Sequence, residues 1–453
     1  MSESEKVVVT KRKLDTLADA INAKADSSGA KTIDELVQTV NGIQVKDIWP
    51  NRISIKTPPT KTIYNPGETI DTTGMVVTVE YSNGAAKDIT SGFTINPTKA
   101  TVGCTHFTVT HTEGISIGST NQAIVVNSPI TIGKNYVSNL NVADTTVRGI
   151  VFAENSYLMI GTDAKYNMYR MWMTQNTSGE SHRVKANATG TYPAADLACS
   201  NGFIAVPMTT AYGGTLYKNR YLASWNSVNE FRNSSSQVSF KVHAQAHVKK
   251  VDRAVAGNNG YVFIGGRYDN HGFFGAIHPS SGDSLQHYDA WTAVIDLAYG
   301  DDILFEISTN NRIHWTPSPT TNTTSYNGPV VDGTVVKCAP LGRNIAVIAR
   351  KTDGYVLYVY RTNDNNTITL THGNRISSNA SDQIVGVNRI GDYLAVIGID
   401  GENNGFISVV DLDTYQDQKY MLGLKPLLTC QSGNGIGVLN NAGGKYAIAR
   451  LSI

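Results

Sequence analysis

The sequence predicts a mainly β protein with a short N-terminal helical segment, a small β-sandwich and a seven-bladed β-propeller. Three observations predict this fold class: helical spacing of apolar residues in residues 1–45, period-two alternation in residues 46–129, and a motif that recurs seven times within residues 130–453. These three ranges are the predicted domains. A chain of 453 residues is too long for one hydrophobic core, which agrees with several domains.

The N-terminal segment carries two helical patterns. Thr10 is a suitable N-cap, and the apolar residues of 14–21 fall on one helix face. Residues 26–29 break this pattern, and Thr32 and Glu35 then form a capping box before a second apolar stripe. Helices this short cannot bury enough surface to be stable alone. We therefore expect them to pack on a copy of themselves, on a partner protein or on the next domain, and we assign residues 1–45 as an anchoring segment.

The second range alternates as β-strands do. Apolar residues take every second position in residues 75–81, which lead into Ser82-Asn-Gly84, a strong hairpin signal. Pro58-Pro59 excludes a central strand at that point, and residues 64–67 read as a turn. Further alternation near Phe107 completes a small sandwich.

Five segments of this range, in order, resemble the bacterial immunoglobulin-like domains of surface and phage tail proteins. The segments are residues 53–64, 66–68, 71–75, 79–84 and 88–90. The resemblance implies an immunoglobulin-like β-sandwich that acts as a spacer or as a weak glycan- and protein-binding module. It brings no catalytic residue with it.

The N-terminal pattern also resembles a known group of segments. Residues 14–24, 32–37 and 40–43 are similar to short leader segments of tail and other structural proteins in phages of Gram-positive bacteria. This resemblance implies a virion protein whose helices contact other virion proteins. A homo-oligomer on the particle is compatible with it.

The repeated motif of the third range joins a few small or polar residues, a Gly, Asn or Asp turn and a strand-like apolar run. Its copies begin at Val151, Leu197, Val255, Leu297, Cys338, Val387 and Cys430. Successive copies are roughly 40 to 60 residues apart, which is the length of one four-stranded propeller blade. The second unit is the longest, and its residues 226–237 are expected to form a polar surface loop.

The last repeat is incomplete. Residues 428–453 provide about three strands, and residues 135–142, which precede the first full unit, are the candidate for the fourth. Such pairing joins the two ends of the ring and removes an exposed sheet edge. The sequence therefore predicts a closed ring.

Charge and hydropathy exclude several classes of partner. The formal net charge is +1 and 17% of residues are charged, so electrostatics favours neither nucleic acid nor an anionic membrane. No apolar stretch approaches the roughly 20 residues that span a bilayer, and residues 1–10 lack the apolar core of a signal peptide. We expect a protein made in the host cytoplasm and located in the virion. The four scattered cysteines predict buried thiols rather than a disulfide framework.

The motifs predict no metal, no cofactor and no catalytic residue. Residues 411–417 superficially resemble a calcium loop, but Gly is missing from the sixth position and Leu422 stands at the twelfth, so a polar hairpin is expected. The Ser-x-Asp-x-Gly-x-Thr-Trp turns of sialidases do not occur. The candidates for a pair of catalytic carboxylates, chosen only by their proximity in sequence, are Asp269, Asp289, Asp301, Asp302 and Glu306, and acidic turn residues are the default expectation for them. We therefore predict that the chain is not an enzyme, with a glycan depolymerase as an alternative.

Aromatic residues beside polar ones are the candidates for ligand binding. Sugars present apolar C–H faces to aromatic rings while their hydroxyl groups bind polar side chains. Two sequence segments combine these residue types, and they supply the predicted ligand-binding residues Tyr268, Asp269, His271, His314 and Trp315. The alternative is that these rings pack between blades, as large aromatic residues usually do.

Together these observations predict a bacteriophage virion structural protein of the tail or baseplate adhesin type. Its N-terminal helices attach to other virion proteins, its immunoglobulin-like domain is a spacer, and its propeller binds a glycan of the host cell surface in host attachment. Many copies per particle would compensate for weak single sites. Two alternatives stay open: a capsid decoration or head-fibre protein, and a glycan depolymerase.

Overall fold

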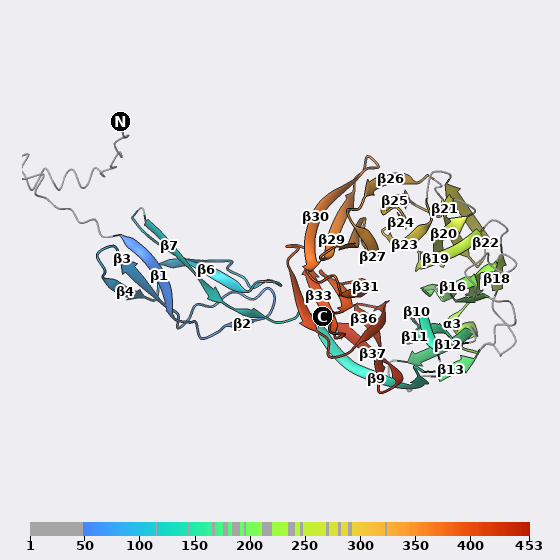
Figure 1. The fold of residues 1–453 in the computed structure, drawn as a ribbon, viewed down its shortest axis with the longest axis horizontal. Helices are drawn as coiled ribbons and strands as arrows, with labels where there is room; N and C mark the ends of the chain where they lie inside the picture. The colour runs from blue at the N-terminus through green and yellow to red at the C-terminus, as the bar shows by residue number, and fades with distance from the viewer. Residues whose placement is uncertain are drawn as a thin grey trace, which may run out of the picture. The chain divides into compact units, whose positions relative to one another are not determined.

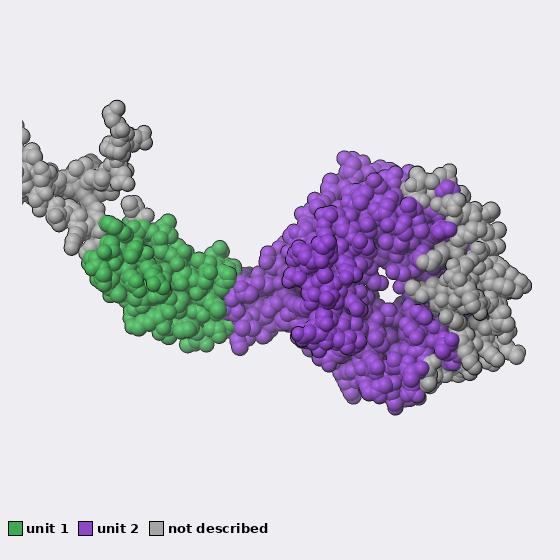
Figure 2. All heavy atoms as spheres, viewed as in Figure 1, with its two compact units in different colours: residues 1–62, 71–97, 106–123 green, residues 63–70, 98–105, 124–453 purple. Residues whose placement is uncertain are grey.

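The computed structural model describes residues 49–453, apart from short gaps at 115, 144, 165–167, 175–179, 184–190, 194–195, 211–219, 234–240, 245–247, 269–270, 280–281, 289–291 and 322–323. The predicted N-terminal helices lie outside the described residues. The described chain is almost entirely β-structure, as the alternating patterns predict. It divides into two compact units (Figure 2).

The first unit, which includes residues 71–97 and 106–123, contains two three-stranded antiparallel sheets. One has the order β1 (Pro50–Thr57), β3 (Val76–Tyr81), β4 (Ala86–Ile89), and the other β5 (Phe93–Asn96), β6 (His106–Glu113), β7 (Ser116–Ala123). Val77, Val79, Phe107 and Val109 alternate into the core and are buried. The predicted hairpin at Ser82–Gly84 is confirmed, because it connects β3 to β4.

The second unit contains three short segments of the predicted sandwich range, which we call the collar: residues 63–70, 98–105 and 124–130. In the collar, β2 (Ile63–Tyr64) pairs in parallel with β8 (Val125–Val126). Val102 and Ile130 pack into an apolar cluster with residues of the last two sheets of the ring. By its contacts, then, the collar belongs to the ring rather than to the first unit.

The rest of the second unit forms seven sheets of four or five strands within its described residues. The first two are β10 (Thr146–Ala153), β11 (Ser156–Thr162), β12 (Met168–Thr174), β13 (Glu180–Arg183), and β14 (Thr191–Pro193), β15 (Ala198–Ser200), β16 (Phe203–Thr210), β17 (Arg220–Trp225), β18 (Lys241–Ala244). The next two are β19 (Val248–Ala256), β20 (Val262–Tyr268), β21 (His271–His278), β22 (Gly282–Tyr288), and β23 (Val294–Gly300), β24 (Ile303–Ser308), β25 (Arg312–Pro317), β26 (Tyr326–Val330).

The fifth and sixth sheets are β27 (Thr334–Leu341), β28 (Asn344–Lys351), β29 (Gly354–Thr362), β30 (Ile368–Ser377), and β31 (Gln383–Ile390), β32 (Tyr393–Ile399), β33 (Gly405–Asp411), β34 (Asp417–Met421). The seventh is β35 (Pro426–Ser432), β36 (Gly435–Ala442), β37 (Lys445–Ser452), with β9 (Thr131–Asn141) as its fourth strand. Figure 1 shows the sheets arranged as a ring.

The ring is continuous. Strands β10, β15, β19, β23, β27, β31 and β35 each contact the next, and β35 contacts β10. Each pair of neighbouring sheets buries an apolar cluster of its own. Burial between sheets, on both faces of the middle strands, is therefore what holds the ring together.

The predicted closing strand is confirmed. β9 pairs antiparallel with β37, so the segment that precedes the first sheet completes the last (Figure 1). Its register shifts between Asn141 and Val137, and within this shift Ser138 and Leu140 are both buried. The Ser138 hydroxyl donates to the carbonyl of Tyr446 at 2.7 Å.

The expectation of a polar surface loop over residues 226–237 is wrong in part. Val228–Asn233 forms the helix α3, which buries Val228 and Phe231. Ser227 caps its start, since the Glu230 amide donates to the Ser227 hydroxyl at 3.0 Å. At the other end the buried Arg170 donates to the carbonyls of Glu230 and Phe231. The helix was missed because six residues are too few to show a helical period.

Candidate functional site

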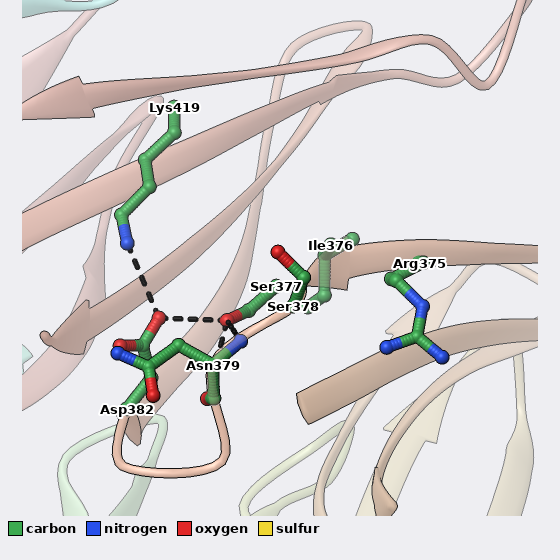
Figure 3. A pocket seen from close by; sticks show the side chains of 7 residues that line it. All are labelled: Arg375, Ile376, Ser377, Ser378, Asn379, Asp382 and Lys419. Atoms are coloured by element: carbon green, nitrogen blue, oxygen red, sulfur yellow. Dashed lines mark hydrogen bonds and ion pairs between the residues drawn. The ribbon is translucent and has the colours of Figure 1, made fainter. Parts of the chain in front are cut away.

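A polar pocket of about 280 Å³ lies where the fifth and sixth sheets of the ring meet (Figure 3). Residues 375–377 at the end of β30 form one side, and Ser378, Asn379 and Asp382 belong to the loop that leads to β31. Lys419 comes from β34. The pocket thus combines two neighbouring sheets and the loop that connects them.

Asp382 forms the base of the pocket. Its side chain is only 1% exposed, and its Oδ2 accepts hydrogen bonds from the Ser377 hydroxyl at 2.7 Å and from Lys419 Nζ at 3.2 Å. Its Oδ1 is buried and has no hydrogen-bond partner among the described residues. The Tyr355 hydroxyl donates to the Asp382 carbonyl at 2.6 Å and so also fixes the backbone. The carboxylate is therefore held in place from several sides.

Two cationic side chains flank the loop. Lys419 Nζ lies 3.9 Å from the ring centroid of Phe406, which holds the ammonium group by a cation–π contact. Arg375 donates from Nη2 to Asp353 Oδ2 at 2.8 Å and from Nη1 to the Asp353 carbonyl at 3.1 Å. Both cations are exposed, and each is oriented by a carboxylate.

Loop residues supply further polar groups. Ser378 and Asn379 are exposed at the rim. Asn379 Oδ1 accepts the Ser381 amide at 2.9 Å, which fixes the side-chain amide of Asn379. The Asn379 amide in turn donates to the Ser377 hydroxyl at 3.1 Å. The loop is thus ordered by its own hydrogen bonds.

A second hollow, of about 370 Å³, lies on the sixth sheet near its connection to β35. Residues 403–405, Met421 and 423–425 line it. It has one charged side chain, Lys425, and no buried ionisable group among its lining residues. The pocket at Asp382 is therefore the better candidate for binding a polar ligand.

The residues predicted from the sequence to bind ligand do not form this pocket. Trp315 is 3% exposed and packs between the fourth and fifth sheets, with its ring stacked on Tyr326 at 5.6 Å between centroids. His314 on the same strand is also buried. The prediction of a ligand surface at these two residues is corrected by their burial, because both faces of β25 are covered.

Two of the other three predicted residues lie on the middle strands of the third sheet. Tyr268 ends β20 and His271 begins β21, and the two are register partners. His271 is half-buried, whereas the side chain of Tyr268 and all of Asp269 lie outside the described residues. The structure therefore does not test a ligand site at Tyr268, Asp269 and His271.

A buried polar layer lies beside His314. Glu306 is its cross-strand partner, and Ser308 and Thr316 are buried on the same strands. Burial raises the pKa of Glu306 well above its ordinary value of 4.5, and the nearby Thr316 hydroxyl opposes the rise without forming a hydrogen bond of good geometry. Burial likewise lowers the pKa of His314 to about 4. Burial therefore favours the uncharged form of both groups, and it also excludes their contact with a polymeric substrate.

Polar side chains on or just before the first contacting strands also link neighbouring sheets. Arg253 Nε donates to Asp296 Oδ1 at 3.1 Å and lies 3.7 Å from Asp196 Oδ2. Asp296 Oδ2 accepts the Cys338 amide at 2.8 Å. These contacts link four successive sheets, from the second to the fifth, and help to hold neighbouring sheets together.

No group of three or more His, Cys, Asp or Glu side chains suited to a metal ion occurs among the residues described. Residues 411–417 form the predicted hairpin between β33 and β34, and Asp411 Oδ1 accepts the amides of Asp413 and Thr414. All four cysteines are free thiols. The described part of the chain has no helix with the length and apolar character of a membrane-spanning helix.

No protein-family model and no curated protein matches the sequence. Solved structures do match. A chain in the crystal structure of the mitotic checkpoint complex is 11% identical with a TM-score of 0.50, covering 72% of this chain and 97% of its own length. The WD40 domain of Toxoplasma gondii coronin is 10% identical with a TM-score of 0.50, covering 71% and 85%. BamB from Moraxella catarrhalis is 12% identical with a TM-score of 0.45, covering 72% and 98%.

Identities this low show the fold alone. The ring of antiparallel sheets and its likeness to a WD40 domain define a β-propeller, so the propeller predicted from the repeats is confirmed as a class. The fold hosts many functions, which must therefore be argued from the site.

Proposed function

We propose that this chain is a bacteriophage virion structural protein of the tail or baseplate adhesin type, whose propeller binds a glycan of the host cell surface. In this proposal the first unit is an immunoglobulin-like spacer, and each of the seven sheets is one blade. The N-terminal segment attaches the chain to other virion proteins. The resemblance of residues 14–43 to segments of phage structural proteins supports the location in a virion, and the resemblance of residues 53–90 to bacterial immunoglobulin-like domains supports the spacer.

The observation that carries the proposal is the way the ring begins. The collar packs on the last two sheets through Val102 and Ile130, and the chain then runs directly into the closing strand β9. A force applied from the N-terminal side therefore enters the ring along a strand that is hydrogen-bonded to β37 over its length. This connection suits a module that is held at one end and binds a surface.

The candidate pocket supports binding rather than cleavage. Its one carboxylate among the lining residues, Asp382, is held by Ser377 and Lys419 in a fixed ion pair. Cleavage of a glycosidic bond usually needs two carboxyl groups on opposite sides of the bond. A glycan depolymerase remains the alternative that an assay of host wall material for released reducing ends would reveal.

Imaging tests the proposal directly. An antibody against the propeller, applied to intact particles, should label the tail tip or baseplate in few symmetric copies, and the purified chain should adhere to host cells. Labelling over the whole capsid at capsomer copy number would instead support the decoration alternative. If purified particles lack the chain altogether, the proposed function is wrong.

A further inference from the structure

We infer that the pocket at Asp382 is a subsite for an anionic saccharide, a sugar or polyol that carries a carboxylate or a phosphate. The inference rests on the proposed function only where it assigns the ligand to the host cell surface. The pocket itself is argued from its hydrogen-bond donors, its charges and its size. No aromatic side chain lines it, so binding there depends on polar contacts instead of ring stacking.

The pocket offers more donors than acceptors. Arg375 has five N–H groups, of which its two bonds to Asp353 use two. Lys419 has three, and its bond to Asp382 uses one. The Ser378 hydroxyl and the Asn379 side-chain NH₂ have no partner among the described residues. A ligand that fits must therefore bring acceptor oxygens.

The acceptors of the pocket are largely occupied or hidden. Asp382 Oδ2 already accepts two hydrogen bonds, and Oδ1 is buried beneath the loop. Asn379 Oδ1 is used by the Ser381 amide. The hydroxyl groups of a neutral sugar donate as well as accept, so a neutral sugar uses this excess of donors less fully than a ligand that also carries an anionic group. A carboxylate or phosphate group has only acceptors in its ionised form, which matches the pocket better.

The charges are arranged so that an anion can be accepted. The ion pair between Arg375 and Asp353 is solvent-exposed, and such pairs contribute little to stability, so Arg375 can contact a second anion at little cost. Lys419 is fixed by Asp382 and Phe406, so it needs no ordering when a ligand binds. The volume of about 280 Å³ is just below the usual size of drug-binding pockets, which suits one small residue of a polymer.

Titration of the full-length chain with three small probes tests this inference. The probes are methyl glucuronide, glycerol phosphate and methyl glucoside, which carry a carboxylate, a phosphate and no charge. We expect saturable binding of at least one anionic probe, at least about tenfold tighter than methyl glucoside and weakened by salt. Binding of the glucuronide alone, or of the phosphate alone, identifies which anion the site takes.

Two matched variants locate the site. Arg375→Gln should weaken binding of the anionic probe about tenfold, equivalent to about 1.4 kcal/mol. Arg343→Gln removes a comparable exposed pair, with Asp364 at 3.3 Å, between two connections of the fifth sheet, and should leave binding unchanged. Equal loss in both variants would overturn the inference, as would equal affinity for methyl glucoside or no saturable binding of any probe.

The two proposals fail separately. If no probe binds but particles are labelled and the chain adheres to host cells, the ligand assignment is wrong and the proposed function stands. If probes bind at Arg375 but purified particles lack the chain, the pocket is a real saccharide site and the virion function is wrong.

Discussion

Closure of the ring by β9 can be tested with one pair of substitutions on the same strand. Leu140 is 8% exposed and belongs to the apolar cluster between the last and first sheets, whereas Val137 is 49% exposed. Leu140→Ala removes buried methyl groups and leaves a cavity, which costs about 2 to 5 kcal/mol. Val137→Ala should change stability by less than about 0.5 kcal/mol.

Thermal melting measures the difference. At about 2 °C per kcal/mol, appropriate to a large domain, Leu140→Ala should lower the melting temperature by about 4 to 10 °C and Val137→Ala by about 1 °C or less. Hydrogen exchange shows where the structure is weakened. The amides of β37 should exchange faster in Leu140→Ala, because their partner strand β9 detaches more often. Equal melting temperatures for the two variants, with unchanged exchange in β37, would show that β9 does not stabilise the ring.

Three further predictions follow from burial and edge exposure. Trp315→Ala should lower the free energy of unfolding by about 3 to 5 kcal/mol, seen as a large drop in melting temperature, because the indole packs between two sheets. A variant that melts like the wild type would show that Trp315 is not part of the core. Glu306 keeps its proton in the folded chain at pH values where the unfolded chain has lost it, so stability should fall as pH rises from about 4.5 towards the raised pKa. Glu306→Gln should abolish that slope in melting curves at a series of pH values, and an unchanged slope would contradict the assignment. A chain that starts at Arg148 lacks β9 and exposes the edge of β37, so light scattering should detect aggregation, whereas a monomeric chain with an unchanged melting temperature would contradict closure.

Much of the propeller could be predicted from the sequence because its signals are local. Each repeat contains its own turn residues and apolar strand, so the approximate positions of the sheets follow from residues close together in the chain. The closing strand could be predicted by counting strands. Residues 428–453 provide only about three of the four strands of a blade, and residues 135–142 form a strand-like segment that belongs to no other repeat. The hairpin at Ser82–Gly84 was likewise specified by its own turn.

The candidate site could not be predicted in this way. Asp382 and Lys419 are 37 positions apart and meet only because the fifth and sixth sheets pack side by side. The loop of residues 378–382 reads in the sequence as an ordinary polar connection. Nothing in the local pattern indicates which lysine of the next sheet would contact it.

The sequence by itself determined the strands, the repeat and the closure of the ring, since these depend on alternation and turn chemistry. Only the tertiary structure decided which aromatic side chains are buried and where a polar pocket forms. Alternation tells which residues share a face of a strand, but in a ring of sheets both faces of a middle strand such as β25 are buried. Trp315 therefore packs in the core although its neighbours in sequence are polar, and the exposed polar groups gather at the junction of two sheets.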